Sequence, residues 1–256
     1  MKESTIEVAG TKLRCSEAGE GPTVLFLHGI AGAAWDPLLD RLAAKYRVVA
    51  PEHPGFGRTA IPDWMMSVGD VAFFYLDVLQ ALDLRDVILA GVSFGGWIAA
   101  EIAIRSTQRL ASLALLASAG VESARAPFDD VFAWSSEEFA QRQFHDRRLA
   151  EDWQRARAAL DVDIVLQNQA AVARLAWNPR LCNPQLTYWL HRIDVPTLLV
   201  WGEEDRVIPF PCHEAFKREI RRAELLALAR SGHALPIERA EEIAPRLDAF
   251  FKGAKG

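Results

Sequence analysis

A serine between two glycines is the clearest sign of chemistry in this sequence. Ser93 lies in Gly91-Val92-Ser93-Phe94-Gly95, directly after the apolar run Val87–Ala90 and before a helical pattern. A serine on so sharp a turn is forced toward strained backbone angles, and only small residues two positions away on either side let the chain pack that tightly. The turn holds the hydroxyl clear of a sheet and directs the first N–H groups of the helix toward whatever binds there. The motif therefore predicts a nucleophilic serine.

Two other interpretations of this segment have less support. A dinucleotide-binding loop of the form GxGxxG would need glycine where Ser93 stands, and the residues that follow offer no acidic side chain at the end of a strand. A serine that only caps the helix is the second alternative. The apolar strand before Ser93 and the glycines beside it favour the nucleophile.

Short apolar runs alternate with helical patterns along the chain. Uninterrupted apolar runs indicate strands that helices cover on both faces. Such runs are found at Thr23–Leu27, Arg47–Ala50, Val87–Ala90, Leu110–Leu116 and Thr197–Trp201. A period near 3.6 indicates helices, and these lie at Val68–Leu82, where Ser67 and Asp70 cap the start, and at Phe94–Arg105 and Pro236–Phe251. Thr5–Val8 and Lys12–Ser16 alternate around a turn and predict an antiparallel hairpin. This order predicts an α/β fold with a mostly parallel central sheet flanked by helices.

The alternation breaks between residues 121 and 193. This stretch has no strand-like run, is rich in charged residues and holds Trp134, Trp153, Trp177 and Trp189. Long connections in compact domains are usually functional, so we interpret 121–193 as a helical lid inserted into a core domain formed by 1–120 and 194–256. A few ordinary helices flanking the sheet are the alternative.

With these motifs in this order, the sequence resembles the α/β-hydrolase family over nearly its whole length. In that family the nucleophile precedes the acid, and the acid precedes the histidine. Four further segments carry the resemblance: His28-Gly29-Ile30, Pro54-Gly55-Phe56-Gly57, the acid turn Trp201-Gly202-Glu203-Glu204-Asp205 and the histidine loop Ser231-Gly232-His233. The resemblance implies an α/β-hydrolase fold and a Ser93–His233–Asp205 triad, with Glu203 and Glu204 as neighbouring acids that fit the pattern less well. It also implies an oxyanion hole formed by the backbone N–H groups of Ile30 and Phe94.

The chemistry of acyl transfer explains why these residue types are needed. A neutral hydroxyl is a poor nucleophile, so an imidazole with an ordinary pKa of about 6.5 suits the removal of its proton near neutral pH. A buried carboxylate then holds the imidazole tautomer and stabilises the imidazolium. This two-step reaction through an acyl-enzyme needs no cofactor or metal, and no two histidines have the helical spacing of a metal site.

Large apolar residues near these motifs could form a substrate pocket. The candidates are Trp35, Trp134, Trp177, Val207 and Ile208. Each such residue is more often core than pocket, but together they favour a small or medium apolar carboxylic ester as substrate.

Several alternatives remain on the same fold. A lactone, a thioester or a carbon–carbon bond could be the target, although Ala234 after His233 and the lack of Gly-Pro-Gly near His28 weigh against carbon–carbon hydrolases. Dehalogenases and epoxide hydrolases of the family use an aspartate nucleophile, which Ser93 argues against. A ligand-binding receptor that keeps the triad is the alternative of another class, and the presence of all three triad residues favours an enzyme.

Composition excludes other function classes. The chain has 256 residues and 29 Lys+Arg against 34 Asp+Glu, so it lacks the positive field of a nucleic-acid groove. It has no apolar run long enough to span a bilayer and no signal-peptide pattern at its start. Its three cysteines form no CxxC pair. We therefore expect a cytoplasmic monomer or homodimer whose partner is a small molecule, with no membrane or nucleic-acid partner.

Overall fold

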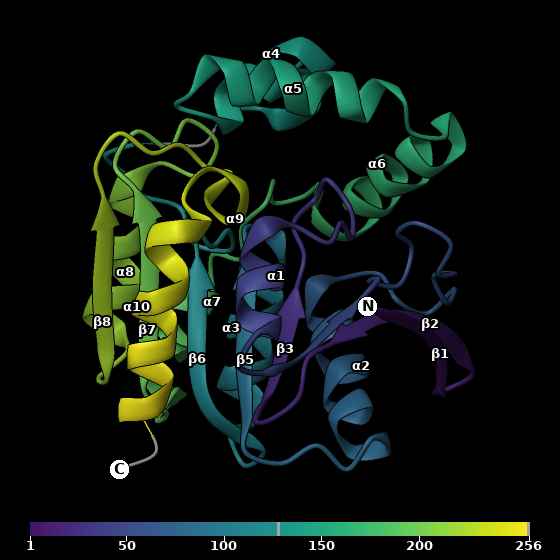
Figure 1. Cartoon of the computed structure of the whole chain (residues 1–256), viewed down its shortest axis with the longest axis vertical. Coiled ribbons are helices and arrows are strands. Elements are labelled where there is room, and N and C mark those ends of the chain that lie inside the picture. Colours follow the sequence, from purple (N-terminus) through teal and green to yellow (C-terminus); the bar gives the residue numbers. More distant parts are fainter. Residues whose placement is uncertain (127–128, 255–256) are drawn as a thin grey trace.

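One twisted sheet forms the centre of the molecule (Figure 1), and the computed structural model describes residues 1–126 and 129–254. The strands of the described chain are β1 (Lys2–Val8), β2 (Thr11–Ala18), β3 (Thr23–Leu27), β4 (Arg47–Pro51), β5 (Val87–Val92), β6 (Leu110–Leu116), β7 (Thr197–Gly202) and β8 (Ala223–Leu228). Their spatial order is β1-β2-β4-β3-β5-β6-β7-β8. Only the pairs that involve β2 are antiparallel, which confirms the N-terminal hairpin and the mostly parallel sheet.

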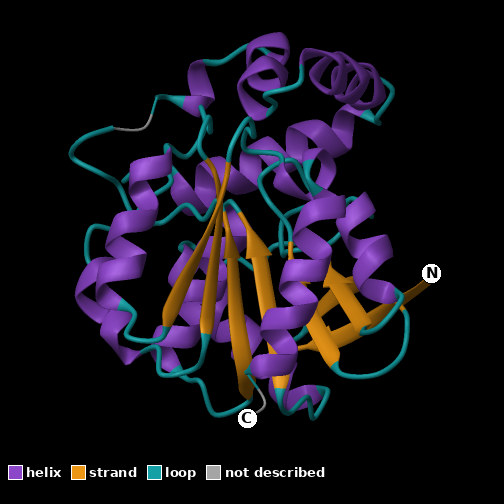
Figure 2. Cartoon of the chain, turned by 60° about the vertical axis from the view of Figure 1, so that its left-hand side comes forward, coloured by secondary structure: helices purple, strands orange, loops and turns teal. Residues whose placement is uncertain are grey.

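Helices cover both faces of this sheet, as Figures 1 and 2 show. The helices of the core are α1 (Pro37–Ala43), α2 (Val68–Ala81), α3 (Phe94–Arg105), α7 (Leu186–Trp189), α8 (His213–Glu219), α9 (Leu235–Glu238) and α10 (Ala240–Gly253). Helix α1 contacts α9 and α10 on one face, whereas α3 packs against α2, β5 and β6 on the other. This two-layer cover explains why the central strands are apolar on both sides.

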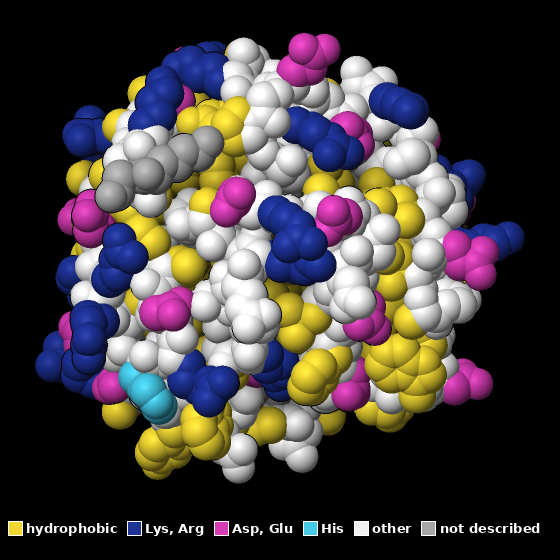
Figure 3. All heavy atoms as spheres, turned by 90° about the horizontal axis from the view of Figure 1, so that it is seen from below, with side chains coloured by type: hydrophobic (Ala, Val, Ile, Leu, Met, Phe, Trp, Pro, Cys, Tyr) yellow, Lys and Arg dark blue, Asp and Glu magenta, His cyan; other side chains and the backbone are white. Residues whose placement is uncertain are grey.

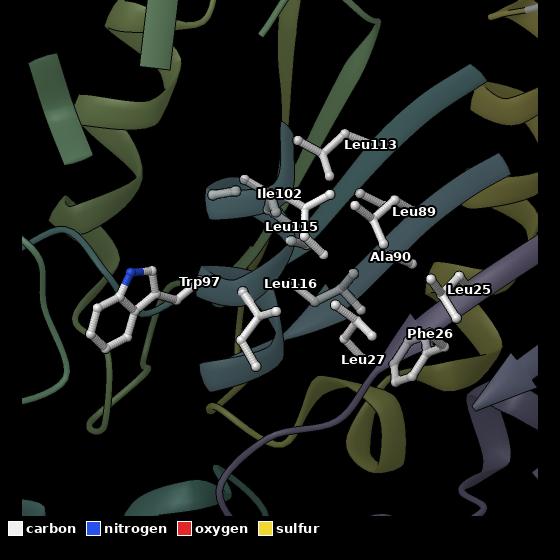
Figure 4. Packing of buried hydrophobic residues seen from close by; sticks show 14 of the residues in the cluster. Leu25, Phe26, Leu27, Leu89, Ala90, Trp97, Ile102, Leu113, Leu115 and Leu116 are labelled. Carbon is white, nitrogen blue, oxygen red and sulfur yellow. The ribbon is translucent and has the colours of Figure 1, made fainter. Parts of the chain in front are cut away.

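The apolar strands form the core. Figure 4 shows leucines of β3, β5 and β6 clustered beside helix α3, with the successive residues Leu115 and Leu116 on opposite faces of β6. Leu25, Leu89, Leu113 and Leu115 have no measurable exposure, and Ile102 of α3 is equally buried. Each such side chain contributes about 1.5–3 kcal/mol by leaving water. The sheet can therefore hold loops at its carboxyl edge in fixed positions.

Three helices lie across the carboxyl edge of the sheet, at the top of Figure 1. They are α4 (Ser136–Gln143), α5 (Arg147–Ala158) and α6 (Val162–Ala176). We call them the lid helices, and they confirm the helical insertion. Near the end of the inserted stretch, Leu186, Leu190 and Ile193 are fully buried in the main apolar cluster, which also includes Ala171 and Val172 of α6.

One predicted helix is divided in two. The pattern over Pro236–Phe251 is interrupted at Arg239, whose φ of −131° and ψ of 22° are not helical. The side chains on either side explain the break. Glu238 accepts hydrogen bonds from the N–H groups of Gly232 and His145, and Arg239 donates to the carbonyl oxygen of Ala229. These hydrogen bonds tie Glu238 and Arg239 to neighbouring loops, and we attribute the break in the helix to them.

Charges of both signs share the surface. Figure 3 shows the face opposite the lid helices, where Lys and Arg side chains are interspersed with Asp and Glu. In residues 1–126 and 129–254, every helix falls short of the length and apolarity that crossing a membrane requires.

The close approach of α3 to the end of β3 yields a test of the fold. A methyl group on Gly95 would overlap the carbonyl oxygens of Leu27 and His28, so Gly95→Ala should lower the free energy of unfolding by about 3 kcal/mol. Gly253→Ala is the matched control, because a methyl group there meets no atom within 4 Å and should change stability by less than about 1 kcal/mol. Urea unfolding followed by circular dichroism measures both. Equal stabilities would contradict the packing described here.

Candidate active site

Ser93 occupies the sharp turn between β5 and α3. Its φ of 56° and ψ of −118° lie in a region that costs a residue with a side chain about 1–3 kcal/mol. Gly91 and Gly95 make the turn sterically feasible, since a methyl group on Gly91 would overlap the carbonyl of Gly95. The carbonyl of Ser93 accepts hydrogen bonds from the N–H groups of Trp97 and Ala119. Hydrogen bonds from α3 and from the segment after β6 thus hold the strained conformation of Ser93.

Asp205 and His233 come from the loops that follow β7 and β8. The Nδ1 atom of His233 lies 2.8 Å from Oδ2 of Asp205, and both side chains are almost fully buried. The other oxygen, Oδ1, accepts hydrogen bonds from the N–H groups of Val207 (2.8 Å) and Ile208 (2.9 Å). These bonds fix the carboxylate as the acceptor for Nδ1–H, which leaves Nε2 of His233 with a free lone pair. That lone pair is what a general base requires.

Ser93 and His233 line one cavity of about 110 Å³, together with Gly29, Ile30 and Val207. We call it the Ser93 cavity. Among the described residues no hydrogen bond joins the Ser93 hydroxyl to His233. Catalytic hydrogen bonds in ligand-free structures are often long and tighten when substrate binds. The structure thus brings the three predicted residues to one place and joins two of them directly.

Of the two predicted oxyanion donors, Ile30 lines the same cavity and Phe94 follows Ser93 in the chain. Gly29 approaches Ser93 so closely that a methyl group on it would lie 3.3 Å from Cβ of Ser93. Ile30 follows it and lines the cavity. The Phe94 N–H is the first of α3 and has no acceptor within the helix. The oxyanion role of these two N–H groups stays a prediction, in a structure where Ile30 lines the cavity of Ser93 and Phe94 follows Ser93 directly.

A buried chain of hydrogen bonds fixes the segment around His28. The N–H of His53 donates to Nε2 of His28 (3.0 Å), so the ring proton of His28 is on Nδ1 and is donated to the carbonyl of Gly29 (2.8 Å). Nε2 of His53 donates to the carbonyl of His28, which leaves Nδ1 to accept from the hydroxyl of Tyr75 at 2.6 Å. Burial lowers the pKa of His28 to about 4 and holds the pKa of His53 well below its ordinary value. Both rings are neutral and serve to position the turn.

The five predicted pocket residues fall in different places. Val207 lines the Ser93 cavity. Trp134 and Trp177 line a larger neighbouring cavity of about 420 Å³ beneath the lid helices, which we call the lid cavity. Trp35 lines neither cavity, and its indole N–H donates to Asp40. Ile208 is fully buried and acts through its backbone.

Ile30 and Phe139 line both the Ser93 cavity and the lid cavity. Phe139 belongs to α4 and Ile30 to the loop after β3. The two cavities are therefore neighbours with shared walls. A substrate with one part at Ser93 could extend toward the lid helices.

Three residues that hold the site together are absent from the sequence-based prediction. The carbonyl of Gln143 accepts hydrogen bonds from the N–H groups of His233 (2.7 Å) and Ala234 (2.8 Å). Asn168 of α6 donates to the carbonyl of Ala31 and accepts from the N–H of Gly57, and Glu238 holds the histidine loop. No signal in the sequence marks Gln143 or Asn168, because their partners lie far away along the chain. In the described residues, no group of three or more His, Cys, Asp and Glu side chains could hold a metal ion.

The neutral histidines predict how stability depends on pH. An unfolded histidine has a pKa near 6.5, whereas His28 in the fold has a pKa of about 4. Between these values the unfolded chain binds a proton that the folded chain does not, so the free energy of unfolding should fall as the pH falls from about 6.5 to 4. Each such histidine contributes a slope of up to about 1.4 kcal/mol per pH unit.

His28→Asn should reduce this slope by up to that amount, even if the whole stability curve is lower. Urea unfolding at pH 7.5, 6.5, 5.5 and 5.0 measures the slope. A variant with the slope of the wild type would show that His28 titrates normally in the fold.

Comparison with known proteins identifies relatives along the whole chain. The 2-hydroxymuconate semialdehyde hydrolase of Pseudomonas sp. strain CF600 is 28% identical over 97% of this chain and 93% of its own. The dihydrolipoyllysine-residue acetyltransferase component of the acetoin cleaving system of Pseudomonas putida is 31% identical over 96% of this chain and 68% of its own.

Solved structures agree in fold. A meta-cleavage product hydrolase from Pseudomonas fluorescens has a TM-score of 0.85 at 24% identity, covering 98% of both chains. An esterase from Exiguobacterium antarcticum has a TM-score of 0.79 at 21% identity, covering 98% of this chain and 100% of its own. The sequence profile of the alpha/beta hydrolase family matches residues 24–246. With its sheet order, its inserted lid helices and this match over most of its length, the chain belongs to the alpha/beta hydrolase family.

Proposed function

We propose that this protein hydrolyses small or medium apolar carboxylic esters through Ser93, His233 and Asp205. The observation that carries the proposal is the hydrogen bond from His233 to the buried carboxylate of Asp205, next to the cavity that Ser93 lines. An imidazole held in this tautomer has its Nε2 free to take a proton, and such a proton acceptor beside a strained serine is suited to activate its hydroxyl.

The reaction proceeds in two steps. Nε2 of His233 takes the hydroxyl proton of Ser93 as Oγ attacks the ester carbonyl, and the resulting imidazolium donates that proton to the departing alcohol. Water then attacks the acyl-enzyme, gives a proton to Nε2 and releases the acid as the proton returns to Ser93. The N–H groups of Ile30 and Phe94 stabilise the oxyanion in each step, and the loss of one such donor typically costs about 3–4 kcal/mol in the barrier.

The cavities support an apolar substrate of limited size. The Ser93 cavity holds about 110 Å³, and the lid cavity next to it holds about 420 Å³ with walls that include Trp134, Val172 and Trp177. We infer that the acyl or alcohol part of the substrate extends into the lid cavity and that the segment 121–193 acts as a lid that selects it. This selectivity depends on pocket shape and is not given by the fold.

Carbon–carbon bond hydrolysis is the second candidate. The relationship to a 2-hydroxymuconate semialdehyde hydrolase over 97% of the chain favours it. Ala234 after His233 and the sequence His28-Gly29-Ile30-Ala31-Gly32 differ from the pattern usual in such hydrolases. An ester therefore remains the better-supported substrate.

The triad assignment predicts large losses of turnover. Ser93→Ala should reduce kcat for 4-nitrophenyl butyrate by on the order of 10⁶-fold and abolish labelling by a fluorophosphonate. Asp205→Asn should reduce kcat by about 10⁴-fold, because the amide stabilises the wrong tautomer of His233. Release of 4-nitrophenolate measures both.

Glu203→Gln is the matched control for Asp205, since Glu203 lies in the same turn and its side chain is exposed. It should retain turnover within about twofold of the wild type. Turnover by Ser93→Ala at the wild-type rate would overturn the proposal. A wild type that binds esters without hydrolysing them would favour the receptor alternative.

The shared wall between the cavities predicts a change in selectivity. Phe139→Ala should merge the Ser93 cavity with the lid cavity and raise the ratio of kcat/KM for 4-nitrophenyl decanoate over 4-nitrophenyl acetate by roughly tenfold. Tyr188→Ala is the control, because Tyr188 is 76% exposed and lies outside both cavities. An unchanged chain-length profile in Phe139→Ala would count against a substrate path through the lid cavity.

A further inference from the structure

One buried side chain at the Ser93 cavity has no partner. Gln143 ends helix α4, is 8% exposed and lines the cavity together with Ser93 and His233. Its Nε2 atom is buried and makes no hydrogen bond among the described residues. An amide NH₂ in this state lacks the water that it had in the unfolded chain, so its position is destabilising unless something binds it.

Two other buried side-chain atoms make no hydrogen bond in the described residues, Oγ of Ser112 and Nε of Arg174, and both lie elsewhere. Ser112 lies on β6 and Arg174 on α6, and neither lines the Ser93 cavity. Gln143 is thus the one unpaired donor among these that a substrate at Ser93 could reach.

The backbone of Gln143 already has a structural role that does not depend on its side chain. Its carbonyl oxygen accepts the N–H groups of His233 and Ala234, and the contact is so close that a methyl group on Gly232 would lie 2.6 Å from this oxygen. Any residue at position 143 would supply the same carbonyl. These bonds hold the side chain of Gln143 beside the catalytic histidine, but they do not explain why it is a glutamine.

Trp153 also lines the cavity and carries an indole N–H, whereas two further polar side chains there are already engaged. His28 is bonded on both ring nitrogens, and Asp36 accepts the N–H of Leu39 at the start of α1. Ser93 and His233 carry the proposed reaction. Apolar groups such as Ile30, Val207 and Ile237 form much of the remaining wall. A donor in such surroundings strongly favours a ligand that brings an acceptor to it.

We propose that the amide of Gln143 donates a hydrogen bond to a carbonyl oxygen of the substrate other than the scissile one, so that the preferred substrates are oxo-substituted esters. This inference rests on the proposed function and narrows its substrate class. The scissile carbonyl itself is bound by the N–H groups of Ile30 and Phe94, so the Gln143 acceptor is a second oxygen nearby. A substrate without it leaves the donor unpaired in a dry site and is bound less well in the transition state.

Matched ester pairs test the proposal. The pairs are 4-nitrophenyl 4-oxopentanoate with 4-nitrophenyl pentanoate, and 4-nitrophenyl 5-oxohexanoate with 4-nitrophenyl hexanoate. The wild type should prefer the oxo ester in at least one pair. Gln143→Met keeps the side-chain length without the donor and should reduce that preference in kcat/KM by between about three- and tenfold.

Gln141→Met is the control on the same helix. Gln141 is exposed and bonds only to Glu137 in the described chain, so its replacement should leave both kcat/KM values unchanged. Gln143→Met should also have a melting temperature at or above that of the wild type, because it removes an unpaired buried donor. A residue needed for folding would show the opposite shift.

The outcomes separate the two proposals. Hydrolysis of the plain esters with no oxo preference, or with a preference that Gln143→Met keeps, would overturn the role of Gln143 and leave the ester hydrolase standing. Equal losses on both members of a pair would do the same, since they indicate a general disturbance of His233. No hydrolysis of any of the four esters would overturn both.

Discussion

The arrangement of the site depends on one hydrogen bond, between Nδ1 of His233 and Oδ2 of Asp205. A buried carboxylate is costly unless it is well bonded, and Asp205 has two backbone N–H groups in addition to the imidazole. The bond joins the loops after β7 and β8, which are neighbours in the sheet. Because both strands are parallel, their carboxyl ends lie side by side and bring the two loops together.

The environment of His233 is completed by groups from other parts of the chain. Glu238 accepts N–H groups from Gly232, His145 and Asp146, so it ties the histidine loop to the segment that joins α4 to α5. The carbonyl of Gln143 likewise ties the histidine loop to the end of α4, because it accepts the N–H groups of His233 and Ala234. Neutral histidines at positions 28 and 53 hold the opposite wall of the cavity. His233 therefore lies among fixed segments, and electrostatic stabilisation of a transition state requires such preorganisation.

Much of this could be predicted from the sequence, and the exceptions share a physical cause. β3, β6 and α3 have the predicted bounds, because apolar runs and helical periods are local signals. Helices α1 and α8 have only seven residues each, too short for a clear period, and no pattern predicted them. The roles of Ser93, Asp205 and His233 rest on motifs that lie within a few residues. Gln143 and Asn168 act through partners that lie far away along the chain, so no local pattern could reveal them. Trp35 and Ile208 show the converse, since an apolar residue near a motif can lie outside the cavity, half-buried like Trp35 or in the core like Ile208.

The lid helices are attached to the core loops at two points, and this attachment limits how the substrate specificity of the protein can change. Helix α4 holds the histidine loop through Gln143, and helix α6 holds the loop after β3 through Asn168, whose amide bonds Ala31 and Gly57 at once. A lid transplanted from a relative would bring new cavity walls but would also remove two supports of the catalytic loops. Evolution of new specificity in this chain is therefore easier by exchange of single wall residues than by exchange of the whole insertion.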